Sequence, residues 1–130
     1  MKIINVISKV LLSLILLMPI LGAVQIFPAP TRELYNTDIA FEFIEMLMTT
    51  RYINYIMSAV FALSIVLLWM KREALAAILI TPITVNIIAF HLFLDGGLFT
   101  PGAVMGNILL VLNIFFLYQN RAKFKPLQSP

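Results

Sequence analysis

The residues best suited to chemistry in this 130-residue sequence gather in one apolar stretch, residues 74–94, and just beyond it. The single histidine, His91, stands four residues before Asp95. At 100° per helical residue, Thr84, His91 and Asp95 fall within about 40° of one another. A carboxylate four residues away could orient the imidazole and favour its protonated form. We therefore take these three residues as a candidate polar site.

A structural role for His91 and Asp95 is the main alternative. Asp95 would then lie in interfacial water, and a neutral His91 would tie this segment to a neighbouring backbone carbonyl. Ionisable groups at membrane depth are costly; they usually face the interior of a helix bundle and mark functional sites. The sequence leaves both interpretations open.

Side-chain amides within apolar stretches form a second set: Gln25, Asn86, Asn107 and Asn113. Asn86 shares its stretch with His91 and joins the candidate site. The amides could line a cavity that binds a quinone or a lipid headgroup. The interpretation we favour is that they join helices, at about 0.6 kcal/mol per bond. Asn107 and Asn113 would point about 120° apart on one helix, so they cannot both line one pocket.

Two backbone features accompany this set. Pro82 removes one helical hydrogen bond and predicts a kink, with Thr81 and Thr84 placed to satisfy freed groups. Gly102 and Gly106 match a close-packing motif of membrane helices. Because Gly102 follows Pro101, we expect Gly102 to lie in a turn and only Gly106 to lie in a helix.

The elements that must position these residues are four apolar stretches, at about 10–27, 52–70, 74–94 and 103–118. Each is close to the roughly 20 residues with which a helix crosses a bilayer. The first could be a signal peptide, but Pro19 interrupts it and no small-x-small cleavage site follows, so we expect an uncleaved helix. Only three residues separate the second stretch from the third, which forces an antiparallel hairpin. The prediction is an all-α four-helix membrane bundle, a single domain over residues 1–130.

Composition excludes several other classes. With 62% hydrophobic and 12% charged residues, the chain could not solvate the surface of a soluble domain. The absence of cysteine excludes disulfides and thiolate metal sites, and one histidine cannot supply both ligands of a bis-histidine haem. The basic residues form no patch for nucleic acid. Nothing in the sequence indicates haem, an iron–sulfur cluster or another metal.

A short helix is predicted at about residues 38–50, between the first two spans. Its polar residues Asp38, Glu42, Glu45 and Thr49 recur at spacings of four, three and four, so they share one face. Thr37 or Asp38 is a suitable N-cap. Such a helix could rest its apolar surface on lipid at the membrane surface. Alternatively the segment simply extends the second span, and a bend near Thr49 and Thr50 would reconcile the two.

Orientation follows from the positions of the charges. With an inside N-terminus, the inner segments carry seven of the nine basic residues and the outer segments five of the six acids. Positive residues are retained on the cytoplasmic side, so both termini are predicted to be cytoplasmic, in the inner membrane. The outer Arg32 and Arg51 could pair with Asp95 or with the acidic helix face, or hold an anionic ligand. We favour exposed ion pairs.

The layout of four spans, an amphipathic stretch after the first and His-x-x-x-Asp closing the third resembles the DoxX-like family of small bacterial membrane proteins. The similarity is greatest in PITVNIIAFHLFLDGGLFTPG and NILLVLNIFFLYQNRAKFKPL, whereas the first half matches in architecture only. The Gly-x-x-Lys often seen in the first helix of the family is here Gly22-Ala-Val-Gln25. The resemblance implies a four-helix bundle associated with complexes that handle thiosulfate, thiols or quinones. It directs attention to Asn86, His91 and Asp95, and implies no catalytic set.

The functional hypothesis is an accessory subunit of a membrane redox complex, in contact with lipid and other membrane subunits, with a quinone as the candidate ligand. The sequence favours this role over an enzyme that acts alone. Two alternatives remain open: a transport or permeation element built by homo-oligomerisation, and a structural protein that interacts with lipid. The sequence names no substrate.

The charge distribution generates a first prediction. A tag on either terminus should stay unlabelled when a membrane-impermeant reagent is applied from the periplasmic face, because both ends are held inside. Labelling of intact and permeabilised cells measures this. A labelled terminus in intact cells, or a chain released by alkaline carbonate, contradicts the prediction.

Overall fold

The computed structural model describes residues 2–130, and these residues form helices and no strand. The long helices are α1 (Lys2–Ala23), α3 (Tyr52–Trp69), α4 (Glu73–Phe93) and α5 (Val104–Gln119). Between them and after them lie η1 (Arg32–Leu34), α2 (Asp38–Thr50), η2 (Pro101–Ala103), α6 (Arg121–Phe124) and η3 (Lys125–Gln128). Four helices are long and apolar enough to cross a membrane, the last of them formed by η2 and α5 together. The predicted all-helical class is thereby confirmed, with four helices of the length and apolar composition that the sequence predicted.

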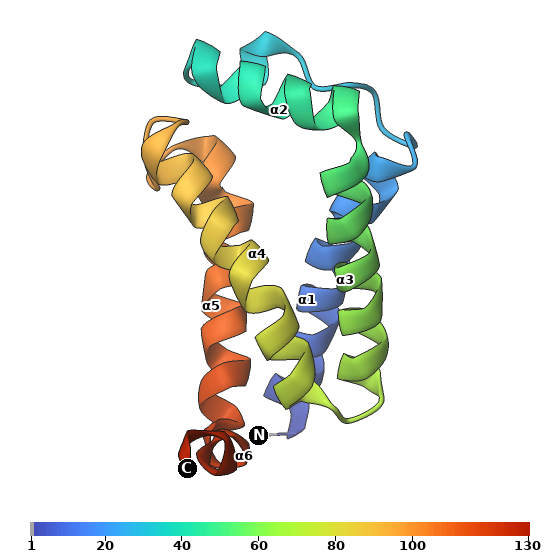
Figure 1. Cartoon of the computed structure of the whole chain (residues 1–130), viewed down its shortest axis with the longest axis vertical. Coiled ribbons are helices and arrows are strands. Elements are labelled where there is room, and N and C mark those ends of the chain that lie inside the picture. The colour runs from blue at the N-terminus through green and yellow to red at the C-terminus, as the bar shows by residue number, and fades with distance from the viewer. Residues whose placement is uncertain (1) are drawn as a thin grey trace.

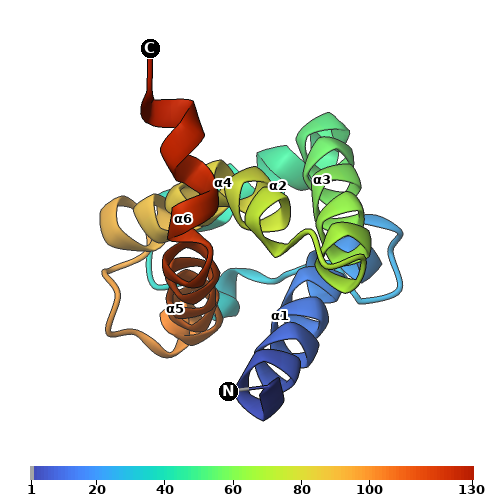
Figure 2. The same ribbon diagram turned by 90° about the horizontal axis from the view of Figure 1, so that it is seen from below.

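The helices pack in the order α1, α3, α4, α5, with α1 and α5 making a smaller direct contact. Figure 1 shows both termini at the same end of the bundle as the α3–α4 turn, while α2 lies across the opposite end. Figure 2, seen from the end that carries the termini, shows α3 beside α1 and α4 beside α5. We call these the termini end and the α2 end.

The first helix differs from its predicted bounds of 10–27. It begins at Lys2 and ends at Ala23, and Gln25 then takes a positive φ of 62°. No proline or glycine precedes Pro19, so the helix extends back over both N-terminal lysines. Hydropathy therefore located this element correctly but placed its two ends too late.

The segment between the first two spans is a separate helix, as predicted. Thr37 caps α2, because its side chain accepts from the Ala40 N–H at 3.1 Å. Arg51 then adopts a left-handed conformation with φ 61°, which ends α2 and turns the chain into α3. The bend that would reconcile the two interpretations thus occurs at Arg51, one residue after Thr50. Its position at a membrane surface stays a prediction.

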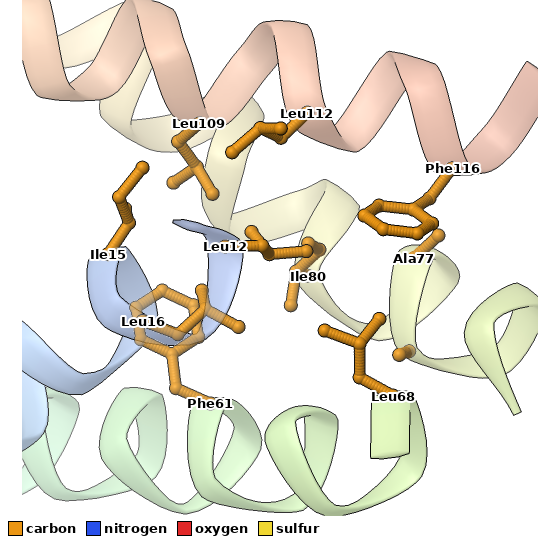
Figure 3. Close-up of a cluster of buried hydrophobic side chains, with 11 residues drawn as sticks. Leu12, Ile15, Leu16, Phe61, Leu68, Ala77, Ile80, Leu109, Leu112 and Phe116 are labelled. Atoms are coloured by element: carbon orange, nitrogen blue, oxygen red, sulfur yellow. The ribbon is translucent and has the colours of Figure 1, made fainter. Parts of the chain in front are cut away.

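The hydrophobic core occupies the half of the bundle near the termini end. Figure 3 shows side chains of all four long helices meeting there, with the Phe116 ring next to Ala77. The buried set is Leu12, Ile15, Leu16, Phe61, Leu68, Ala76, Ala77, Ile80, Leu109, Leu112 and Phe116. At the same end Lys9 Nζ lies 2.6 Å from Glu73 Oε1, which joins α1 to the start of α4. This half of the molecule is fixed by close packing.

The core supplies a matched pair of substitutions on α3. Leu68 is 1% exposed and Leu63 is 50% exposed. Leu68→Ala should lower the free energy of unfolding in detergent by about 2–5 kcal/mol, because it leaves a cavity among packed helices. Leu63→Ala should lower the free energy of unfolding far less, because Leu63 is half exposed. Equal losses for the two variants, measured by thermal or SDS-induced unfolding, would show that this packing does not hold the bundle.

Candidate functional site

A cavity of about 730 Å³ lies towards the α2 end of the bundle, away from the packed core. Side chains of α1, α2, α3 and α4 line it, together with the segment before α2 and the loop after α4. Figure 1 shows the α1–α3 pair diverging from the α4–α5 pair towards this end, with α2 across the opening. Its walls are mostly apolar, with Phe43, Leu47, Met57, Ile87 and Phe90 among them. Ligand sites commonly combine such walls with a few polar groups.

The polar groups of the cavity include both residues of the predicted His–Asp pair. His91 Nδ1 lies 3.3 Å from Asp95 Oδ2, and Asp95 is only 1% exposed. The expectation that Asp95 would lie in interfacial water is therefore wrong, because the loop before α2 covers it. His91 Nδ1 is buried yet makes no hydrogen bond within residues 2–130, so the two groups are close without being aligned.

The cover over Asp95 comes from Asn36, a residue that the sequence analysis missed. The Asn36 backbone N–H donates to Asp95 Oδ1 at 2.8 Å, and Asn36 Nδ2 donates to the Asp95 backbone carbonyl at 2.9 Å. The Thr37 hydroxyl donates to the Leu94 carbonyl beside them. These bonds tie the end of α4 to the start of α2. The only sequence signal was the capping residue Thr37, which does not reveal a partner 57 residues away.

Both glycines of the predicted close-packing motif flank the pair. Gly102 lies in η2, as the expected turn requires, and a Cβ there would sit 3.6 Å from Asp95 Oδ2. A Cβ on Gly106 would approach Ile87 Cγ2 to 3.1 Å and His91 Cδ2 to 3.5 Å. The lack of a side chain at Gly106 therefore lets α5 come close to α4 beside the imidazole.

Thr84, the third predicted member, is not brought to the cavity. It is buried and its hydroxyl donates to the Ile80 carbonyl at 2.9 Å, within its own helix. Thr81 likewise donates to Ala77. Neither hydroxyl bonds the carbonyl of Ile78, the one that Pro82 leaves without its helical donor. Pro82 itself lies within α4 and lines the cavity.

The intramembrane amides divide into two kinds. Asn113 donates to the Ala77 carbonyl at 3.0 Å and so joins α5 to α4, and Asn107 donates to the Leu98 carbonyl at 2.7 Å. Gln25 lies beyond the end of α1, outside any helix. Asn86 makes no side-chain hydrogen bond to residues 2–130, and it lines the cavity. The predicted role of joining helices therefore fits Asn113, while Asn107 ties α5 to the loop that precedes it. Asn86 has neither contact and lines the cavity.

Neither outer arginine pairs with Asp95. Arg32 Nε lies 2.5 Å from Asp38 Oδ1 in an exposed ion pair, and Arg32 Nη1 donates to the Tyr35 carbonyl. The Gln25 side-chain oxygen, in the amide orientation that satisfies both groups, accepts from Arg51 Nη2 at 2.5 Å and from Nη1 at 3.1 Å. The interpretation as an exposed ion pair thus fits Arg32, while Arg51 contacts an amide.

The segment from Gln25 to Arg51 acts as a strap over the cavity. Its two ends, both with positive φ, contact each other, and its middle is held to Asp95 through Asn36. Tyr35 of this strap lines the cavity. Its ring packs edge-on against the Phe90 ring, with the ring centroids 6.4 Å apart. Burial raises the pKa of the Tyr35 phenol, and the nearby Asp95 carboxylate raises it further. Tyr35 therefore stays a neutral hydrogen-bond donor at physiological pH.

No protein-family model, curated protein or solved structure matches this chain. The resemblance to the DoxX-like family therefore stays a prediction. Residues 2–130 hold no group of three or more histidine, cysteine or acidic side chains that could bind a metal ion.

The contacts of Asp95 generate a stability prediction. Asp95→Ala should lower the free energy of unfolding by about 1–3 kcal/mol, because it leaves the Asn36 N–H without an acceptor. Asp95→Asn keeps an acceptor oxygen for this N–H, so it should lower the free energy of unfolding less than Asp95→Ala does. Limited proteolysis within the strap should accelerate in Asp95→Ala.

Asp38→Ala is the control, since it removes only the exposed ion pair with Arg32 and should change stability by at most about 1 kcal/mol. Thermal unfolding in detergent measures all three variants. An Asp95→Ala protein as stable and protease-resistant as Asp38→Ala would show that the strap is held by other contacts.

Proposed function

We propose that this chain is an accessory subunit of a membrane redox complex that binds a lipophilic, quinone-class ligand. The observation that supports the proposal most directly is the cavity of about 730 Å³ with apolar walls and a polar end. Its polar end carries His91, which has a buried ring nitrogen without a hydrogen-bond partner in residues 2–130. A ligand with an apolar body and a hydrogen-bonding ring fits that combination.

The His–Asp pair suits a ligand whose chemistry moves protons. Reduction of a quinone to a quinol takes up two electrons and two protons. An imidazole beside a carboxylate can act as a general acid or base towards such a ligand. The electrons would come from a partner subunit, because a chain without cysteine cannot hold a thiolate-ligated cluster or a dithiol. This is why we assign the chain an accessory role.

The proposed placement puts the termini end in the cytoplasm and the α2 end at the outer face of the inner membrane. Figure 1 places both termini and the α3–α4 turn at one end, and these segments carry Lys2, Lys71, Arg72, Arg121, Lys123 and Lys125. Basic residues favour the cytoplasmic side. The acidic face of α2 would then meet water, with the cavity opening below it in the outer leaflet. The DoxX-like resemblance supports the same class of complex.

The test is purification from native membranes in mild detergent, followed by lipid extraction, spectra and identification of co-purifying proteins. We expect a bound quinone and a redox partner. His91→Leu should reduce the bound quinone severalfold in a protein that still folds, which circular dichroism checks. The control is Leu92→Ala, the neighbouring residue, which is exposed and does not line the cavity.

Three other outcomes would each contradict the proposal. Absence of quinone and of any redox partner would remove its basis. Ion or solute flux through liposomes containing a defined oligomer would favour the transport alternative. A folded His91→Leu protein with unchanged quinone content and phenotype would favour a structural, lipid-interacting role.

A further inference from the structure

Asn86 differs from the other amides of the apolar segments because its side chain has no hydrogen-bond partner within residues 2–130. Asn107 and Asn113 each donate to a backbone carbonyl, and Gln25 faces Arg51. The Asn86 side chain has no hydrogen bond to residues 2–130, although it lies in the middle of α4. An amide without a partner in an apolar environment costs several kcal/mol. Asn86 is therefore the one of these amides that is open to a ligand.

The position of Asn86 on α4 places its unpaired amide at the cavity. Asn86 is exposed, and it lines the cavity together with Pro82, one turn before it. The neighbouring Val85 side chain is also exposed, but it does not line the cavity. Because Asn86 lines the cavity, its amide can reach a molecule bound between the apolar walls.

The spacing of the two polar points restricts the ligand. Asn86 and His91 are five residues apart on α4, which places them about 7.5 Å apart along the helix axis and about 140° apart around it. Both nevertheless line the cavity, so they lie on two sides of the wall that α4 contributes. Between them the cavity wall consists of Ile87 and Phe90. A ligand that satisfies both points has two polar atoms on opposite sides of an apolar body. A six-membered ring with oxygens at opposite positions has this shape.

We infer that Asn86 hydrogen-bonds the deeper of two ring oxygens, while the His91 end of the cavity receives the other. This inference rests on the proposed function, since it concerns the same cavity. A primary amide can donate to a carbonyl oxygen and accept from a hydroxyl. Asn86 can therefore hold both a quinone and its quinol, without itself taking part in proton transfer. It is a specificity-determining residue for ligands with two opposed oxygens.

The experiment is titration calorimetry of the purified full chain with two probes. One is a benzoquinone with a ten-carbon tail, and the other is a phenol that has the same tail and a single ring oxygen. Asn86→Leu should weaken binding of the quinone about tenfold, which corresponds to one neutral hydrogen bond of about 1.4 kcal/mol. His91→Leu should also weaken it. The phenol has only one oxygen to place, so at most one of the two substitutions should weaken its binding.

Val85→Ala is the matched control and should bind both probes as the unchanged protein does. Asn86→Ala serves as a second variant, and circular dichroism checks that each variant is folded. If the unchanged protein binds neither probe, the proposed function fails. If it binds the quinone and both Asn86 variants bind equally tightly, the cavity is a ligand site but Asn86 is merely solvated, and the present inference is overturned.

Discussion

The structure depends on one constraint: within a bilayer, a hydrogen-bonding group must find its partner inside the protein. Most polar side chains of the long helices obey it locally. Ser64 and Thr84 donate to carbonyls one turn back, and Asn113 donates to a neighbouring helix. Among the exceptions, Asn86 and the His91 Nδ1 nitrogen belong to residues that line the same cavity. Ser58 Oγ is a further buried group that has no hydrogen-bond partner within residues 2–130.

The two ends of the bundle satisfy the constraint differently. Near the termini, leucines and phenylalanines of all four long helices fill the space, and only a few polar pairs such as Lys9 with Glu73 are needed. At the α2 end the helices diverge and the strap closes over them. The strap is held by hydrogen bonds at Asp95 rather than by a large buried core, so this end can leave a cavity. Close packing at one end is thus combined with an open volume at the other.

The sequence predicted the features that depend on neighbouring residues. The four spans, the hairpin between the second and third, and the N-cap at Thr37 all follow from local hydropathy and spacing. The pairing of Asn36 with Asp95 joins residues 59 apart, and no local pattern indicates it. The sequence placed a bend near Thr49 and Thr50, but Arg51 takes the left-handed conformation, which arginine rarely adopts, so its residue type did not mark the position. The lack of a partner for Asn86 is a property of the whole packing, which a single sequence cannot show.

Asp95 cannot by itself distinguish a structural site from a functional one. Its carboxylate faces His91 through one oxygen and accepts the Asn36 N–H through the other, so a substitution there disturbs the cavity and the strap together. The Asn86 side chain makes no hydrogen bond to the rest of the described chain, so its loss removes no bond that holds the fold. His91 differs, because its Nδ1 lies 3.3 Å from the buried Asp95 carboxylate and its ring packs beside Phe90. Binding defects at these two positions therefore report on the cavity alone only in variants of unchanged stability.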